Sequence, residues 1–144
     1  MCTAVIHHDT KTAFPQPDAQ IPVLMKEGAE QLYLWGRREW EQGQLPATGW
    51  ARLESIKSGK WDRLNPTPVK VCVTQFAERA SKNIEHWFKL TEGAYLQGAL
   101  VKMGNEQRVY IVTVPSGTYK RWPRLIGQGE ILQCSPPDDL FGGW

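Results

Sequence analysis

Short strand-like segments separated by turn residues run along this chain and limit what it can fold into. Residues 21–25 and 31–35 are apolar segments on either side of the turn residues Glu27 and Gly28, and they predict a β-hairpin. Pro22 cannot donate a backbone hydrogen bond, so it belongs near a strand start or at an edge. Residues 69–74 alternate and are rich in β-branched side chains, which predicts another strand. Residues 85–90, 94–102 and 107–114 follow one another closely and predict an antiparallel meander.

Helical periodicity is confined to one short stretch. Trp50, Leu53 and Ile56 have near-helical spacing, which predicts a short helix over residues 50–58 that ends at Gly59. We therefore expect one α+β domain, mostly antiparallel β-sheet with a few short helices, over residues 1–134. Residues 135–144 are rich in proline and glycine and predict a loosely attached tail.

Composition excludes several classes of protein. Apolar residues make up 41% and charged residues 22% of the 144 positions, as in a globular domain. No apolar run is long enough to span a membrane, and no signal peptide is recognisable, so we expect a cytoplasmic protein without a membrane partner. Three cysteines without metal-ligand spacing suit a reducing compartment and predict neither a metal site nor a cofactor.

Positive charge is concentrated in the middle of the sequence. Residues 31–130 carry fifteen Lys and Arg against nine acidic residues, a net charge of +6, whereas the two ends are each at −2. A polyanion such as nucleic acid would be bound by this middle section. A solvated surface of mixed charge is the alternative.

Cys2 is the residue whose chemistry stands out, because the usual catalytic motifs are missing. Removal of Met1 would leave a chain that begins with a 1,2-aminothiol. Its amine and thiol have ordinary pKa values of about 8 and 8.5, so each is partly deprotonated near neutral pH. Such a group condenses with an aldehyde to an imine, and the thiol then closes a thiazolidine ring. The ring-opened sugar of an abasic DNA site is an aldehyde of this kind.

A series of short segments resembles the SRAP family of SOS response-associated peptidase-like proteins. The matching segments follow the family's order over roughly residues 2–125. They are residues 1–4, 21–23, 35–40, 50–54, 71–73, 76–79, 87–90, 98–101, 110–113 and 119–123. The resemblance implies an antiparallel, barrel-like fold and a role in the DNA damage (SOS) response. It also implies binding of single-stranded DNA and a covalent crosslink to abasic sites through the N-terminal cysteine.

Four positions correspond to the family's catalytic constellation of cysteine, asparagine, glutamate and histidine. Cys2 and Glu78 match the first and third, and the resemblance gives Glu78 a general acid/base role. Trp50 stands in place of the asparagine and Tyr119 in place of the histidine, while Ala4 replaces an arginine that contacts DNA. A phenol is a poor proton shuttle at neutral pH, so we expect slower crosslinking and much slower release, or loss of the activity.

Other residues are candidates for DNA contacts. The resemblance indicates Arg52 as a DNA-contacting arginine, with an ion pair on a helix surface as the alternative. The remaining candidate phosphate contacts are Arg37, Arg38, Arg79, Lys120 and Arg121. His7 and His8 lie close to Cys2 in sequence and could stand in for the missing histidine, although ordinary surface histidines are the simpler interpretation.

Three functions remain open from the sequence. The chain could be an abasic-site sensor that crosslinks to single-stranded DNA, which makes its enzymatic status uncertain because two of the four catalytic positions are changed. It could be a binding module that retains the fold and the basic residues without the covalent chemistry. It could also be an interaction protein that reuses the scaffold, because fold alone does not define function.

Overall fold

Five strands close into a barrel at the centre of the molecule. Around the barrel they are β10 (Glu106–Ser116), β4 (Glu30–Trp35), β3 (Gln20–Leu24), β6 (Thr67–Val71) and β9 (Ala94–Met103), and β9 pairs again with β10. Neighbouring strands are antiparallel except β4 and β10, which are parallel. The structure is a computed structural model that describes residues 2–80 and 84–137.

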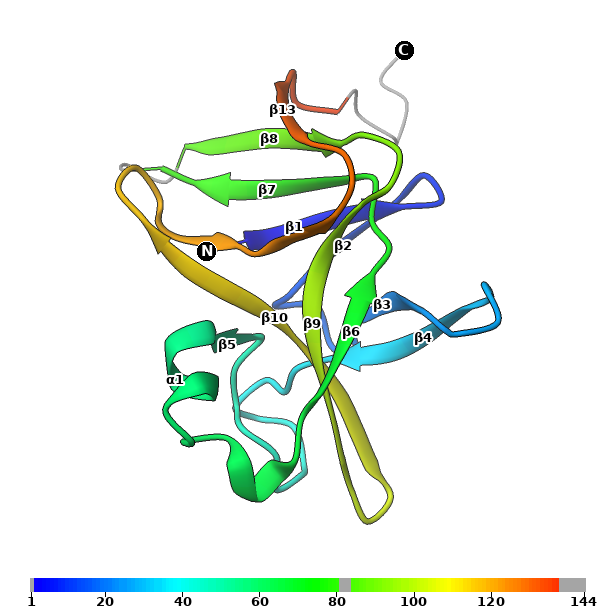
Figure 1. Cartoon of the computed structure of the whole chain (residues 1–144), viewed down its shortest axis with the longest axis vertical. Coiled ribbons are helices and arrows are strands. Elements are labelled where there is room, and N and C mark those ends of the chain that lie inside the picture. Colours follow the sequence, from blue (N-terminus) through cyan, green and yellow to red (C-terminus); the bar gives the residue numbers. More distant parts are fainter. Residues whose placement is uncertain (1, 81–83, 138–144) are drawn as a thin grey trace.

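A second sheet of five strands lies across the top of the barrel in the view of Figure 1. Its order is β13 (Ile131–Cys134), β8 (Glu85–Leu90), β7 (Gln75–Arg79), β1 (Cys2–His7) and β2 (Thr10–Ala13), and every pairing is antiparallel. The described residues thus form a small domain that is mostly antiparallel β-sheet.

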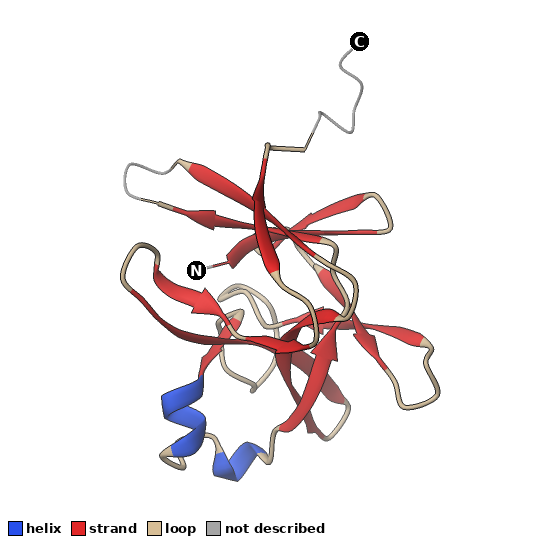
Figure 2. Cartoon of the chain, turned by 45° about the horizontal axis from the view of Figure 1, so that its top comes forward, coloured by secondary structure: helices blue, strands red, loops and turns tan. Residues whose placement is uncertain are grey.

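The remaining elements extend or cover the barrel. Strands β5 (Trp50–Arg52) and β11 (Lys120–Pro123) pair with β10, and β12 (Leu125–Gly127) pairs with β9. The one α-helix of the described residues, α1 (Leu53–Lys57), and the short 3₁₀ helix η1 (Asp62–Leu64) lie together at one side of the strands (Figure 2).

Buried side chains form three clusters that join these layers. The largest takes members from both sheets, including Val5, Phe76 and Phe88 from the upper sheet and Ile21 and Trp35 from the barrel. Because one continuous core links the two sheets, the barrel fixes the position of the inner face of the upper sheet. A second cluster packs β9 and β10 against the helical segment, and a third lies on the outer face of the upper sheet.

Most of the predicted strands are present, with shifted ends. The hairpin over residues 21–35 is confirmed as β3 and β4, and Gly28 in its turn has a φ of +86°, which favours glycine. The predicted hairpin of the last two meander strands is confirmed as β9 and β10. The predicted meander is wrong in its first member, because β8 pairs with β7 and β13.

The predicted helix and tail also differ from the structure. The expected helix over residues 50–58 begins as strand β5, which pairs with β10, and only then turns into α1. Most of the predicted tail, residues 138–144, lies outside the described part of the chain.

A candidate active site around Cys2

A β-bulge turns the side chain of Cys2 into the core. Cys2 lies directly opposite Glu78 of β7, and the register slips by one residue between Cys2 and Ala4, so Thr3 is an extra residue in β1. Ala4 belongs to the cluster on the outer face of the upper sheet, and strict alternation would put Cys2 on that face too. Because of the bulge, Cys2 instead joins Val5 in the main core.

Glu78 lies on the same inner face and is completely buried, with 0% of its surface exposed. Burial disfavours the charged carboxylate and raises the pKa of Glu78 to about 7. A carboxyl group with this pKa can both donate and accept a proton near neutral pH, which suits a general acid/base. An ordinary surface glutamate would be ionised at that pH.

The Cys2 thiol shares this environment. It is also 0% exposed, and it donates a hydrogen bond of 3.7 Å from Sγ to the carbonyl of Ala4. Burial, and secondly the neighbouring Glu78 carboxylate, raise the pKa of Cys2 well above its ordinary value. The sulfur therefore enters any reaction as a thiol whose proton must pass to a base.

Trp50 reaches the same site from the other sheet. Its indole Nε1 donates a hydrogen bond of 2.8 Å to the carbonyl oxygen of Cys2, and its ring packs against Phe14 and Trp35 with centroids 4.9 and 6.4 Å away. The indole is half-buried and holds the start of β1 against the barrel.

His86 completes a row of side chains across three strands. It lies directly opposite Glu78 in β8, so Cys2, Glu78 and His86 occupy neighbouring positions on one face of the sheet. Adjacent strands lie about 4.8 Å apart, which keeps these side chains within reach of one another. Tyr119, just before β11, forms a hydrogen bond of 2.8 Å between its hydroxyl and Nδ1 of His86.

The sequence predicted Cys2, Glu78, Trp50 and Tyr119 as the site, and the structure brings these four residues together. It adds His86, which the sequence analysis did not select. The signal that could have found it is the hairpin of β7 and β8, whose register fixes Glu78 opposite His86.

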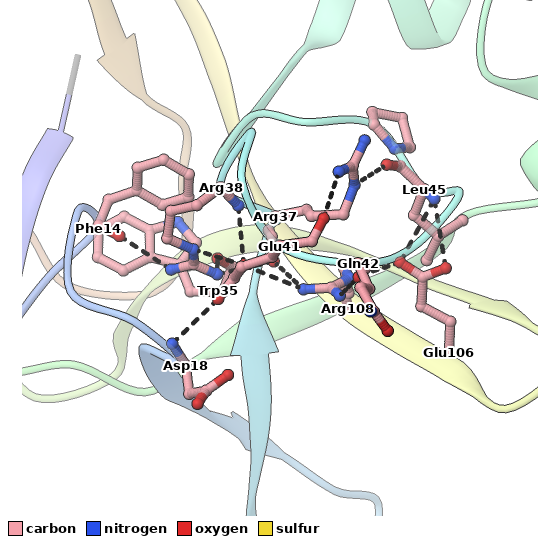
Figure 3. Close-up of polar contacts among 12 residues, drawn as sticks. Phe14, Asp18, Trp35, Arg37, Arg38, Glu41, Gln42, Leu45, Glu106 and Arg108 are labelled. Carbon is pink, nitrogen blue, oxygen red and sulfur yellow. Dashed lines mark hydrogen bonds and ion pairs between the residues drawn. The ribbon is translucent and has the colours of Figure 1, made fainter.

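Arg38 is not available to contact DNA. It is 2% exposed, and its guanidinium donates to the carbonyls of Phe14, Trp35 and Gly36 at 2.7–2.9 Å and to the carboxylate of Glu41 at 2.8 Å (Figure 3). Its donors are therefore used to close the loop after β4. We withdraw Arg38 from the candidate phosphate contacts.

The same network includes a second buried arginine. Arg108 forms ion pairs with Glu106 at 2.6 Å and with Glu41 at 3.6 Å, and it donates to the carbonyls of Gly36 and Gln42 (Figure 3). Burial raises the pKa of Glu41, but hydrogen bonds from Arg38 and from the backbone of Asp18 outweigh burial and lower it below its ordinary value. This network, which we call the arginine network, comprises Arg38, Glu41, Glu106 and Arg108.

The side chains of Arg37 and Arg121 also form hydrogen bonds within the protein. Arg37 donates to the carbonyls of Leu45 and Glu41 at 2.6 and 2.8 Å (Figure 3). Arg121 binds Glu54 with two parallel hydrogen bonds of 2.7 and 2.8 Å. Glu54 thus pairs with Arg121 and not with Arg52, so the ion pair expected as the alternative for Arg52 is not found among the described residues.

Three of the predicted DNA-contacting residues are exposed: Arg52, Arg79 and Lys120. Among the described residues, none of their side chains forms an ion pair or a hydrogen bond. Each lies next to the candidate site in the chain, because Arg79 follows Glu78, Lys120 follows Tyr119, and Arg52 is two residues beyond Trp50.

The remaining candidates lie away from Cys2. His7 is at the opposite end of β1, about 16 Å along the strand, and His8 pairs with Glu30. Neither replaces the missing histidine. Burial raises the pKa of Cys72 to about 11, which makes it an unreactive thiol.

Within residues 2–80 and 84–137, no cluster of His, Cys, Asp and Glu could hold a metal ion. None of the helices in this part of the chain has the length and apolar character needed to cross a membrane. Comparisons with models of protein families, with curated proteins and with solved structures found no significant match.

Proposed function

We propose that this chain is an SRAP-like protein that binds single-stranded DNA and forms a thiazolidine crosslink with abasic sites through Cys2. The observation that carries the proposal is the position of Cys2 directly opposite a buried Glu78 whose pKa is raised to about 7. The reaction needs an aminothiol and a group that moves protons at neutral pH, and the two lie side by side.

The reaction requires a chain from which Met1 has been removed, so that the α-amine of Cys2 is available. The amine attacks the sugar aldehyde to give a carbinolamine. Protonated Glu78 then donates a proton to the departing hydroxyl, which leaves as water and produces an iminium. The thiol adds to the iminium carbon and returns its proton to the Glu78 carboxylate. The products are the thiazolidine and one water, and Glu78 ends in the state in which it began.

Burial of Cys2 sets the requirement for access. Because Cys2 is 0% exposed, an aldehyde reaches it only when the start of β1 moves away from Trp50. Pairing with β2 begins only at Ala4, so Cys2 is held by pairing with β7, by its side chain in the core and by the hydrogen bond from Trp50. A local opening of this kind costs less than unfolding the domain.

Binding of the DNA strand would rest on Arg52, Arg79 and Lys120. Exposed cations without ion pairs are free to contact phosphates, and these three flank the residues of the site in sequence. Such contacts position the strand without reading its bases. We also propose a cytoplasmic location and a role in the DNA damage response, and this role rests on the resemblance to the SRAP family.

A second function, non-covalent binding of single-stranded DNA, is favoured by the complete burial of the Cys2 thiol. In this second function the three exposed cations bind the DNA strand, and Cys2 forms no covalent bond with it. The two functions differ in whether the complex survives denaturation.

The test uses the chain without Met1 and three single strands of equal sequence: abasic, undamaged, and abasic with the aldehyde reduced to an alcohol. On a denaturing gel, only the first should give a slower band. A native gel at low salt should show binding to all three, and this binding should weaken as salt rises. Binding to all three without a denaturation-resistant band would support the non-covalent function, and no binding at low salt would contradict both.

A further inference from the structure

His86 has a position that the reaction described above does not use. It is the third member of the row that begins with Cys2 and Glu78, and its Nδ1 is 2.8 Å from the Tyr119 hydroxyl. The Tyr119 ring is itself held by Phe88 and Trp122, with centroids 5.8 and 5.2 Å away. The imidazole is thus fixed in orientation beside a buried carboxyl.

We propose that His86 is the proton-exchange residue of this site, which passes protons between Glu78 and solvent, and that Tyr119 positions its imidazole. The proposal rests on the proposed function, since it assigns a proton path for the reaction at Cys2. It also gives Tyr119 a role that a phenol can fill: fixing a neighbouring ring rather than moving the proton itself.

Within the reaction the protons balance at Glu78: it relays one from nitrogen to oxygen as the carbinolamine forms, gives one to the departing hydroxyl and recovers one from the thiol. The reaction begins only when Glu78 is protonated, and its carboxyl is completely buried with a pKa raised to about 7. Such a carboxyl needs a neighbouring group to exchange its proton with solvent. His86 can pass a proton to an ionised Glu78 before the reaction and take up one from solvent in its place.

Tyr119 is suited to hold His86 through this exchange. A phenolic hydroxyl can accept a hydrogen bond from Nδ1–H, and this bond persists whether the imidazole is neutral or charged. With Nδ1 held in this way, Nε2 is the atom that takes up and releases the proton. Imidazole is the side chain whose ordinary pKa places its charge change near neutrality, as proton exchange at cellular pH requires.

His86 is only partly buried, so its imidazole can exchange protons with solvent. Its partner Tyr119 lines a shallow surface pocket of about 290 Å³ with Pro115, Ser116, Thr118 and Trp122. Among the described residues, the titratable groups on this face are Glu78 on β7 directly opposite His86, Cys2 on β1 beyond Glu78, and Tyr119 before β11. Arg79 and Glu85 form the next pair of the ladder and point to the opposite face.

The test compares the natural chain without Met1 with His86→Gln, Tyr119→Phe and the control His8→Gln, an exposed histidine outside the site. Rates of thiazolidine formation are measured from pH 5 to 9 by mass spectrometry, with abasic single-stranded DNA and separately with glycolaldehyde. His86→Gln should lower the rate near neutral pH on the order of 100-fold, and its pH profile should lose one titration. Tyr119→Phe should have a smaller effect in the same direction, and His8→Gln none.

The two aldehydes separate this proposal from the proposed function. If glycolaldehyde reacts in a His86-dependent way but abasic DNA does not, the DNA function fails and the role of His86 stands. If His86→Gln matches the natural chain in rate and in pH profile with both aldehydes, the proposal is overturned. A lower rate in His86→Gln with an unchanged profile, together with a reduced melting temperature, would also overturn it, since that result describes a structural residue.

Discussion

Two regions of this molecule bury glutamate side chains, and they treat them in opposite ways. In the arginine network, Glu41 and Glu106 accept hydrogen bonds from arginine side chains and backbone amides. These bonds outweigh the effect of burial and lower both pKa values. Beside Cys2, burial dominates and raises the pKa of Glu78 to about 7. Glutamate is thus held in its ionised form in the arginine network, whereas beside Cys2 it can gain or lose a proton near neutral pH.

This difference in pKa separates the charged residues that stabilise the fold from those that can take part in a reaction or in binding. Arg38 and Arg108 form ion pairs and close loops, so they have few donors left for another molecule. Arg52, Arg79 and Lys120, which adjoin residues of the Cys2 site in the sequence, are by contrast exposed.

The largest effect is expected at the nucleophile. Cys2→Ser should abolish the denaturation-resistant product, because a hydroxyl closes the ring far less readily than a thiol. Cys72→Ser and Cys134→Ser are matched controls outside the row and should leave the yield unchanged. Equal loss in all three variants, measured on denaturing gels, would mean that the reactive group is not Cys2.

Glu78→Gln should slow crosslinking by about 100- to 10,000-fold, the usual range for a positioned general acid/base. Gln has nearly the same size, so the fold should persist, which a thermal melt can check. Glu106→Gln is the opposite case: it should leave the crosslinking rate unchanged while lowering the melting temperature. A similar rate loss in both variants would show that the two regions do not differ as described.

In the arginine network, loss of the Arg38 guanidinium removes a donor from the carboxylate of Glu41 and leaves the carbonyls of Phe14, Trp35 and Gly36 without that donor. Arg38→Met should therefore lower the free energy of unfolding by about 3–5 kcal/mol. Arg52→Gln, at an exposed position, should change it by less than about 0.5 kcal/mol. The effects on DNA binding should be the opposite. Arg52→Gln should reduce the slope of log affinity against log salt by about one, because one phosphate contact is lost, and Arg38→Met should leave this slope unchanged. Denaturant melts and salt titrations of both variants measure the contrast.

A smaller effect is expected on the pH dependence of the free energy of unfolding, to which Glu78 contributes. Its pKa is about 7 in the folded chain and about 4.5 ordinarily, so the folded state holds the proton more tightly. This contribution to stability is complete below pH 4.5 and is lost as pH rises to about 7, in total about 3 kcal/mol. Glu78→Gln should remove this loss, so the variant should gain stability relative to the natural chain as pH rises. Parallel curves of melting temperature against pH for the two chains would contradict a buried, protonated Glu78.

Local sequence predicted individual strands well and their partners less well. The turn at Gly28 specified the hairpin of β3 and β4, because hairpin partners are adjacent in sequence. The pairing of β8 could not be read in this way, since the strand belongs to the upper sheet and its partner β13 lies more than 40 residues further on. Trp50 also has helical spacing to Leu53, but pairing with β10 overrides that local tendency.

The site could be predicted only in part for a related reason. Glu78 was assigned from the resemblance to the SRAP family, but its raised pKa depends on burial that no sequence pattern reports. His86 was missed because its role depends on the register of β7 with β8. Arg38 was misjudged because its charge suggested exposure, whereas carbonyls from the loops around β4 surround it.

The most direct test of the Cys2 site is the intact mass of the product that the folded chain forms with an abasic oligonucleotide. With Met1 removed, the product should have the summed mass of protein and DNA less one water, and fragmentation should place the DNA on Cys2. The same chain with Met1 retained has no free amine on Cys2 and should give no such product. Equal product from both chains, or none from the chain that begins at Cys2, would contradict the proposed chemistry.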